Sequence, residues 1–352
     1  MKKNIVVFVI LLSMLACDLV GSTATSTPSA TATATKGASA STSTPAAPGV
    51  PATAGGPTQA IPSPLPQSDV GRIARRHMEA LVAIGARVPG SANEQRAAEY
   101  IRQTFANLGY APQVQTFAAY DDDDVEFTSA NVIAVKQGNS SKEIIVGAHY
   151  DSTGDGLGAD DNASGVGVML EIAERVAQMQ TPYTVRFIAF GAEENDLDGS
   201  YFYADGMTDD EVKYTVAYVN VDAIAVGDVA YVYSEEGADA FLRDWVLNWA
   251  SGAGFPLQTI RDVDLLDFGD YVADYGAFWD RGIPYIYFEA TNWDLGDKDG
   301  YTQVDPKYGD EGEIWDTEFD TLVYIDATFP GRVDEHLRLF ASALFAVCAE
   351  YR

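Results

Sequence analysis

The stretch EIIVGAHYD, residues 143–151, joins an apolar run typical of a buried strand to two residues that suit metal chemistry. Its Ile-Ile-Val core favours a strand, and His149 and Asp151 follow where such a strand would end. Six further β-rich runs lie at residues 113–117, 131–135, 184–190, 215–221, 229–233 and 284–288. Helical spacing of apolar residues predicts two helices within residues 70–108 and further helices at 161–179, 239–250 and 332–351.

This alternation of strands and helices predicts an α/β fold. We expect a single domain built on a mixed, mostly parallel β-sheet with helices on both faces. The first two runs, 113–117 and 131–135, have no helical segment between them, so they predict a hairpin at one edge of the sheet. In open α/β sheets the ligand crevice lies beyond the carboxyl ends of the strands. Residues that directly follow a strand are therefore the candidates for chemistry.

The N-terminal part of the chain predicts export. Residues 1–17 resemble a secretory signal, because two lysines precede an apolar run that is too short for a membrane span. The Leu-Ala-Cys ending resembles a bacterial lipoprotein cleavage site, so we expect cleavage before Cys17, a lipid on it and a place on the cell surface. The alternative is a plain signal peptide and secretion. Residues 18–68, rich in Ser, Thr, Ala and Pro, predict a disordered tether, and residues 69–352 the catalytic domain.

The charge of the chain excludes some partners and favours others. Its 52 acidic and 22 basic residues give a formal net charge of −30. Such a domain repels phosphate backbones, which argues against nucleic-acid binding, and it repels anionic lipid as well. The expected membrane attachment is therefore only the lipid on Cys17. The domain favours cations, including metal ions and the amino termini of peptides.

Two strand ends carry residues that could hold and use a metal ion. On a continuing strand His149 and Asp151 would face the same side, so Asp151 could fix the imidazole tautomer while the other ring nitrogen meets a metal. Glu193 and Glu194 follow the run at 184–190. Because neighbouring side chains point in different directions, one glutamate could coordinate a metal and the other could activate water as a general base.

Further carboxylates complete the candidate set. Asp160 and Asp161 begin a predicted helix, where one carboxylate could bridge two ions; the alternative is that both cap the helix. Asp222 follows the run at 215–221 and adds a carboxylate at a third strand end. The other two histidines, His77 and His336, lie within predicted helices, where we expect them to pack rather than to bind metal.

Together these segments resemble the co-catalytic zinc aminopeptidases of metallopeptidase family twenty-eight, which also contains glutamate carboxypeptidases and glutaminyl cyclases. The resemblance implies the zinc-dependent exopeptidase fold. It also implies that His149 and Asp222 hold one zinc ion, that Asp161 bridges two ions, that Glu194 holds the second and that Glu193 is the general base. Peptides would be the substrates of such an enzyme.

The chain departs from the family at the fifth ligand. Family members have a histidine before a threonine, whereas this chain reads Asp316-Thr317 at that place. The second site would then consist of Asp161, Glu194 and Asp316, an all-oxygen set that favours manganese, magnesium or calcium over zinc. The competing interpretation is a second site that is weak or empty, with one working metal.

The sequence thus predicts a metallo-aminopeptidase with two divalent ions, in which Glu193 activates a metal-bound water. A glutaminyl cyclase or a carboxypeptidase of the same fold is an alternative. Another is a surface lipoprotein that binds peptides without hydrolysing them, for which Asp316 is the main support. Trp293, Tyr301 and Tyr308 are candidates either to line an apolar cleft or to pack the surrounding loops.

Overall fold

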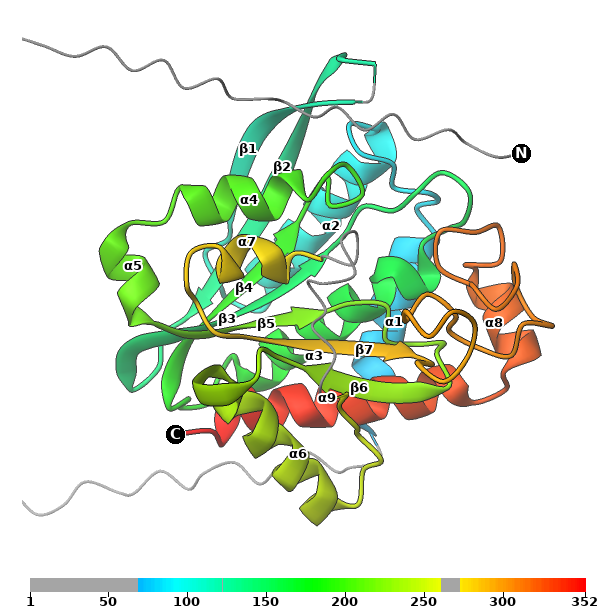
Figure 1. Cartoon of the computed structure of the whole chain (residues 1–352). Coiled ribbons are helices and arrows are strands. Elements are labelled where there is room, and N and C mark those ends of the chain that lie inside the picture. Colours follow the sequence, from blue (N-terminus) through cyan, green and yellow to red (C-terminus); the bar gives the residue numbers. More distant parts are fainter. Residues whose placement is uncertain (1–68, 122, 261–272) are drawn as a thin grey trace, which may run out of the picture. The chain divides into compact units, whose positions relative to one another are not determined.

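The apolar runs form one seven-stranded sheet in the computed structural model, which describes residues 69–121, 123–260 and 273–352 (Figure 1). The strands are β1 (Gln113–Tyr120), β2 (Glu126–Lys136), β3 (Ser140–His149), β4 (Tyr183–Phe190), β5 (Thr215–Val221), β6 (Val229–Tyr233) and β7 (Tyr285–Thr291). Each overlaps one predicted run, so the predicted strands are confirmed. The predicted signal peptide, 1–17, and tether, 18–68, lie outside the described residues.

The order of the strands is β1-β2-β4-β3-β5-β7-β6. The four strands β4, β3, β5 and β7 are parallel, whereas the pairs β1–β2, β2–β4 and β6–β7 are antiparallel. The predicted mixed sheet with a hairpin at one edge is therefore confirmed. Its parallel part is the central block of four strands, where the candidate residues lie.

Helices cover both faces of the sheet (Figure 1). Along β3, Ile144 and Val146 belong to one apolar layer and Ile145 to the other, as the alternation of side chains on a strand requires. The first layer is covered by α1 (Arg72–Val82), α2 (Ala92–Asn107), α3 (Gly165–Val176), α6 (Phe241–Ala253), α8 (Leu322–Thr328) and α9 (Arg332–Ala349). The second is covered by α4 (Asp198–Asp205), α5 (Asp209–Tyr214) and α7 (Tyr275–Trp279).

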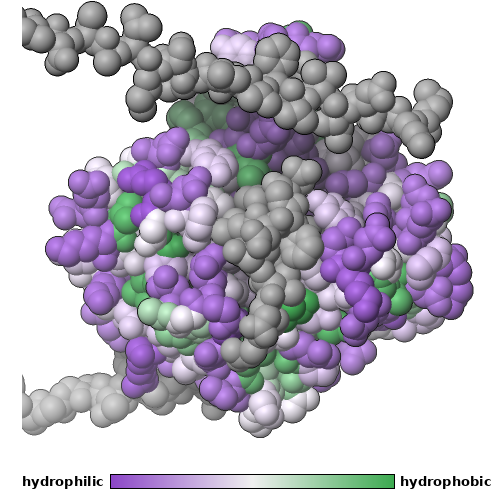
Figure 2. All heavy atoms as spheres, in the orientation of Figure 1, coloured by the Kyte–Doolittle hydropathy of each residue, from purple (hydrophilic) through white to green (hydrophobic). Residues whose placement is uncertain are grey.

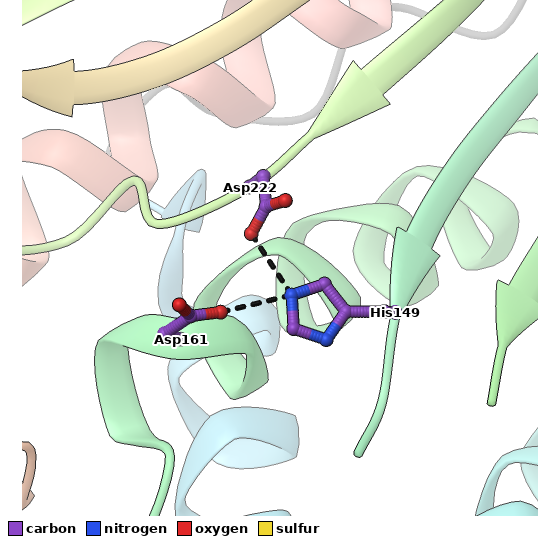
Figure 3. A group of neighbouring side chains, drawn as sticks. All are labelled: His149, Asp161 and Asp222. Atoms are coloured by element: carbon purple, nitrogen blue, oxygen red, sulfur yellow. Dashed lines mark hydrogen bonds and ion pairs between the residues drawn. The ribbon is translucent and has the colours of Figure 1, made fainter. Parts of the chain in front are cut away.

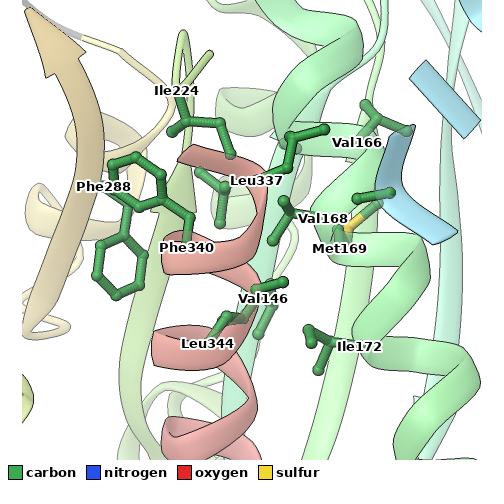
Figure 4. Close-up of a cluster of buried hydrophobic side chains, with 14 of the residues drawn as sticks. Val146, Val166, Val168, Met169, Ile172, Ile224, Phe288, Leu337, Phe340 and Leu344 are labelled. Atoms are coloured by element: carbon green, nitrogen blue, oxygen red, sulfur yellow. The ribbon is translucent and has the colours of Figure 1, made fainter. Parts of the chain in front are cut away.

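The larger apolar layer packs α3 and α9 against the central strands. Met169 and Ile172 of α3, Phe340 and Leu344 of α9, and Val146 of β3 are all fully buried in one cluster (Figure 4). Burying a side chain of this size stabilises the fold by about 1.5–3 kcal/mol. The layer therefore gives the carboxyl ends of β3, β4 and β5 a rigid support.

Two helix predictions need comment. The predicted helix at 161–179 is wrong at its start, because Asp161 has φ −110° and ψ 99°, and the regular helix α3 begins only at Gly165. A Cβ on Gly165 would lie 2.1 Å from the Val221 carbonyl oxygen, so the helix start approaches the end of β5 as closely as only glycine permits. The predicted break between the first two helices is confirmed, and Ser91 caps α2 by accepting a hydrogen bond from the Glu94 amide.

Candidate metal centre

The candidate residues meet where three neighbouring parallel strands end. His149 is the last residue of β3, which pairs with β4 on one side and β5 on the other. Glu193 and Glu194 follow the end of β4, and Asp222 follows the end of β5. Residues far apart in sequence therefore converge at one edge of the sheet, as expected for an α/β crevice.

His149 lies at the centre of the first group of potential ligands (Figure 3). Its Nε2 atom lies 2.8 Å from Asp161 Oδ1 and 3.1 Å from Asp222 Oδ1. The three side chains come from β3, from the segment Ala159–Ser164 and from the loop after β5, and they point toward one another. One imidazole and two carboxylates converging in this way form a set of the type that binds zinc.

A second group shares Asp161 with the first. Potential ligand atoms of Asp161, Glu194 and Asp316 all lie within 4.8 Å of one another, as do those of His149, Glu193 and Glu194. Asp316 has φ 54°, a left-handed conformation that aspartate adopts more readily than most residues. The structure thus brings together all five predicted ligands and the predicted base.

Asp151 makes a different contact from the one expected. Its Oδ1 atom is 3.6 Å from His149 Nδ1, which is longer than a normal hydrogen bond. Its Oδ2 atom accepts a hydrogen bond of 3.0 Å from the Glu194 amide. Asp151 is therefore placed beside the imidazole, and it also fixes the backbone of the loop that carries both glutamates.

The second aspartate of the Asp160-Asp161 pair has a different surrounding from the first. Asp160 is fully buried and accepts hydrogen bonds of 2.6 Å from the Ala225 amide and from Gln303 Nε2. It therefore links loops and is in none of the metal-ligand groups of the described residues. Asp161 has its carboxylate at the centre of the cluster, so neither aspartate acts as the simple helix cap considered above.

Two residues that the sequence did not indicate hold Asp161 and Asp316 in position. The Asp320 carboxylate accepts hydrogen bonds from the Asp160 and Asp161 amides, at 2.6 and 3.1 Å. The side-chain oxygen of Gln303, Oε1, accepts hydrogen bonds of 2.9 Å from the amides of Ile314 and Trp315, just before Asp316. The sequence offers no local signal for either residue, because the burial that makes these polar side chains need partners is seen only in the structure.

Arg87 ties together the two ends of the loop that connects His149 to the segment with Asp161. Its fully buried guanidinium donates hydrogen bonds to the carbonyl oxygens of Tyr150, Leu157 and Gly158, at 2.6, 2.7 and 2.8 Å. Gly158 has φ +57°, and a Cβ there would lie 2.5 Å from Arg87 Nη2, so only glycine fits this approach.

The carboxylates strongly affect one another. Burial raises the pKa of Glu193 and of Glu194 well above the ordinary glutamate value, and neighbouring carboxylates raise both further. Loss of part of the surrounding solvent and the nearby Asp161 carboxylate raise the pKa of Asp316, which is still partly exposed, to about 7. Burial alone would lower the pKa of His149, but Glu193, Asp222 and Asp161 outweigh it and raise that pKa well above the usual range. The cluster therefore attracts cations, whether protons or metal ions.

This charge cluster predicts how the metal-free protein responds to pH. Because folding raises the pKa of Glu193, Glu194 and Asp316, the folded state binds more protons than the unfolded state between about pH 4 and pH 7. The free energy of unfolding of chelator-treated protein should therefore fall as the pH rises through this range. Urea unfolding between pH 5 and pH 8 measures it, and excess zinc should remove most of the fall. A metal-free protein that gains stability over this range would contradict the expectation.

The cluster opens into a cavity of about 140 Å³. Its lining residues are His149, Asp161, Glu193, Glu194, Asp222, Ala223, Ala273, Tyr287, Glu289, Tyr301, Trp315 and Asp316. Tyr301 thus lines the cavity, whereas the Trp293 indole donates to the Tyr233 hydroxyl and Tyr308 packs edge-on against Phe329. Glu289 was missed from the sequence, although a carboxylate near the end of an apolar strand is itself a signal.

The other two histidines lie away from the cluster. His77 is within 2.7 Å of the Tyr100 hydroxyl, and burial lowers its pKa to about 4. His336 lies edge-on to Phe340 in α9, and burial lowers its pKa to about 4 as well. Neither belongs to a metal-ligand group of the described residues, in keeping with the expectation that they pack.

Comparison with known proteins supports the same family as the motifs. The sequence model of peptidase family M28 matches residues 131–341. The alkaline phosphatase isozyme conversion protein of Escherichia coli is 34% identical over 283 residues, which cover 72% of this chain and 82% of that protein. Aminopeptidase YwaD of Bacillus subtilis is 31% identical over 188 residues, 51% of this chain and 38% of its own length. "Probable lipoprotein aminopeptidase LpqL" of Mycobacterium tuberculosis is 38% identical over 107 residues, 30% of this chain and 21% of its length.

Solved structures share the fold. A zinc aminopeptidase from Bacillus subtilis superposes with a TM-score of 0.65 at 19% identity, covering 82% of this chain and 97% of that one. A glutaminyl cyclase from Porphyromonas gingivalis gives a TM-score of 0.60 at 20% identity, covering 78% and 95%. The expected exopeptidase-type fold and the expected peptide hydrolase are thereby confirmed. Because the family model matches more than half of the chain, and a relative of 34% identity is covered over most of its length, this chain belongs to peptidase family M28.

Proposed function

We propose that the chain is a metal-dependent aminopeptidase that removes N-terminal residues from peptides. The observation that carries the proposal is the sharing of Asp161 between two ligand groups, one with His149 and Asp222 and the other with Glu194 and Asp316. Such an arrangement suits two cations side by side. The aminopeptidase names of related proteins agree with this proposal.

The residues present fit divalent metal ions. Two buried carboxylate oxygens accept no hydrogen bond from the described residues: Glu194 Oε1, and Asp161 Oδ1, whose printed contact is the ion pair with His149 Nε2 at 2.8 Å. Buried carboxylate oxygens without such partners are costly unless a cation satisfies them. In our proposal His149 and Asp222 would hold one ion, Glu194 and Asp316 would hold the other, and Asp161 would be available to both positions. When bound, the ions would supply Lewis acidity that polarises a peptide carbonyl and acidifies water.

Glu193 is the proposed general base. Its carboxylate belongs to a group with His149 and Glu194 and lines the cavity, so a water in the cavity is within its reach. Burial keeps its proton affinity high, which suits a group that takes a proton from water and passes it to the leaving amine. Asp151 supports this step indirectly, because it holds the Glu194 amide and with it the loop.

The two proposed positions differ in chemistry. The first has an imidazole, which suits zinc, whereas the second has only carboxylate oxygens, which suit manganese, magnesium or calcium as well as zinc. The second position is thus the weaker zinc site. The competing proposal is that the protein works with one ion, held at the first position. The two proposals differ in whether Asp316 binds a metal ion.

Substitution Asp316→His should strengthen zinc binding at the second position. An imidazole is a better zinc ligand than a third carboxylate, so we expect zinc affinity there to rise by about 10-fold or more and manganese preference to fall. Competition titration with a chromophoric chelator measures both affinities. The variant Glu318→His, two residues away on an exposed side chain, is the matched control. Unchanged metal affinity and preference in Asp316→His would mean that Asp316 is not a ligand.

The charges around the cavity favour a substrate with a free amino terminus. The described residues that line it include six carboxylates and no lysine or arginine. The surface drawn in Figure 2 is also largely hydrophilic, in line with the net charge of −30. A carboxypeptidase needs a cation for the terminal carboxylate, but Arg281 instead donates to the carbonyl oxygens of Ala204 and Met207, and Arg261 lies outside the described residues.

A substrate panel tests this choice. We expect hydrolysis of peptides with a free amino terminus, no hydrolysis of the same peptides after N-acetylation, and no cyclisation of N-terminal glutamine. Mass spectrometry distinguishes loss of one N-terminal residue from loss of ammonia. Release of C-terminal residues, or loss of ammonia, would replace the proposal with a carboxypeptidase or a glutaminyl cyclase; no reaction with any peptide would favour a binding protein without catalysis.

We also propose that the domain acts outside the cytoplasm, on a lipid anchor at Cys17. The lipoprotein name of one relative agrees with this. None of the helices in the described residues is long and apolar enough to span a bilayer. Metabolic labelling with a fatty acid should mark the wild-type chain but not a Cys17→Ser variant.

A further inference from the structure

We propose that the outer edge of strand β1 binds an extended part of the peptide substrate as an added strand. The inference rests on the proposed aminopeptidase function and deepens it, because it makes long, unfolded peptides the substrate class. The contact is with the peptide backbone and lies away from the metal centre, so it does not depend on which residue is removed.

Strand β1 lies at the margin of the sheet and pairs on one side only (Figure 1). All eight of its residues, Gln113–Tyr120, pair with β2 in one unbroken register. No residue that the structure describes pairs with its other side. The opposite margin differs, because Gln258 covers the edge of β6: its amide donates to the Ala230 oxygen and its carbonyl accepts from the Val232 amide, both at 2.9 Å. Within the described part of the chain, alternate N–H and C=O groups of β1 are therefore open to another strand.

The sequence of β1 lacks the features that protect edge strands from further pairing. Natural edge strands carry lysine or proline, are very short, or contain a bulge. The eight residues QVQTFAAY include no charged residue, no proline and no glycine, although 21% of the whole chain is charged. Val114 and Tyr120 are exposed large apolar residues. This edge therefore has the composition of a strand that receives a partner.

The carboxyl end of β1 lies at the same end of the sheet as the metal centre. Both β1 and β4 are antiparallel to β2, so they run in the same direction. The Tyr120 carbonyl oxygen accepts a hydrogen bond of 2.9 Å from Asn195 Nδ2, and Phe117 shares a small apolar cluster with Ala192. Ala192 and Asn195 flank the two glutamates of the metal centre. The open edge therefore ends beside the loop that carries the proposed base.

Charge favours a peptide as the partner and selects its direction. Two copies of the chain, each with a net charge of −30, repel one another. The exposed Asp121, Asp123 and Asp124 follow Tyr120 in the turn to β2. A peptide antiparallel to β1 has its amino terminus at this acidic end, whereas a parallel one has its carboxyl terminus there, and the aspartates attract the first and repel the second. Antiparallel addition thus directs the amino terminus toward the metal centre, as an aminopeptidase requires.

The spacing of the strands sets the peptide length that this site needs. An added strand lies about four strand spacings, or roughly 19 Å, from β3, because β1, β2 and β4 come between them. An extended chain covers about 3.3 Å per residue, so roughly six residues lead from His149 to the paired segment. With about five paired residues, the benefit should begin at peptides of roughly 11 residues.

Hydrolysis of peptides of different length tests the inference. We expect kcat/KM of the zinc-loaded, full-length protein to be about 10-fold higher for an unstructured peptide of about 16 residues than for the tetrapeptide with the same N-terminal sequence. N-methylation of the downstream backbone amides removes the strand donors of the long peptide and keeps its side chains. The methylated peptide should therefore be hydrolysed no faster than the tetrapeptide.

Hydrogen exchange locates the contact without turnover. In the Glu193→Gln variant the long peptide should slow exchange of the outward-facing amides of Gln113–Tyr120 by about 10-fold or more. It should leave the amides of Val229–Tyr233 unchanged, because the edge of β6 is already covered. The N-methylated peptide is the matched control and should protect neither strand.

The possible outcomes separate this inference from the proposed function. Tetrapeptides hydrolysed as fast as long peptides, with no protection of β1, would overturn the inference and leave the aminopeptidase proposal standing. Protection of β1 by the long peptide without hydrolysis of any peptide would support the edge site and refute the aminopeptidase. A dimer in sedimentation, with β1 amides that exchange slowly before peptide is added, would assign the edge to a second copy of the chain and overturn the inference.

Discussion

Replacing Glu193 with glutamine should lower kcat by about 10³-fold while leaving the metal content close to that of the wild type. Glutamine has nearly the same shape as glutamate but cannot take a proton from water. His149, Asp161, Glu194, Asp222 and Asp316 all remain in this variant, so the proposed ligands are intact. The variant would therefore lack the general base but still bind its metal ions.

Two measurements on purified protein separate these effects. Hydrolysis of an aminoacyl nitroanilide gives kcat, and elemental analysis gives bound metal per chain. The matched control is Glu318→Gln, an exposed carboxylate near the site, which should behave as the wild type. Full turnover in Glu193→Gln would show that Glu193 is not the base. Loss of metal together with loss of turnover would indicate that Glu193 is a metal ligand.

Replacing Arg87 with methionine should destabilise the fold by about 3–6 kcal/mol. The buried carbonyl oxygens of Tyr150, Leu157 and Gly158 would each lose a charged donor, and leaving a buried acceptor unsatisfied costs about 1–3 kcal/mol. The charge also matters, because Asp320, Asp151 and Asp161 lie close enough to Arg87 to interact with it. Many domains have little more stability than this in total.

Urea unfolding at constant pH and zinc concentration measures the loss. Arg87→Lys keeps the charge but lacks the planar fork that reaches three carbonyls, so it should recover only part of the stability. Arg96→Met, on the exposed face of α2, should change the unfolding free energy by less than about 0.5 kcal/mol. An Arg87→Met variant as stable as Arg96→Met would contradict the structural role of this guanidinium.

The sequence predicted the sheet and most of the candidate site because both depend on local signals. The run before His149 forms β3, and His149, Glu193 and Asp222 each follow a strand, so adjacency in a parallel sheet brings them together. The start of α3 was predicted four residues too early, because Asp161 is a polar residue of the kind that begins helices. In the structure the backbone of Asp161 is non-helical, and its amide donates to Asp320. Arg87 holds the same loop through the carbonyl oxygen of Gly158.

The supporting residues could not be read from the sequence in the same way. Asp320 and Gln303 act on loops that lie more than 140 residues away along the chain, through hydrogen bonds that no local pattern encodes. Glu289 is similar, because only the fold places it in the same cavity as the ligands of other strands. The helices α4, α5, α7 and α8 are short, with 5 to 8 residues each, and too little periodicity to predict.

The central claim is that His149, Asp161, Asp222, Glu194 and Asp316 hold the ions on which peptide hydrolysis depends. Zinc titration of chelator-treated protein, with aminoacyl-nitroanilide hydrolysis as the readout, tests it most directly. The claim predicts no turnover without metal and full recovery as zinc is restored, ending at two equivalents per chain. Turnover that persists in protein shown to be metal-free would contradict it.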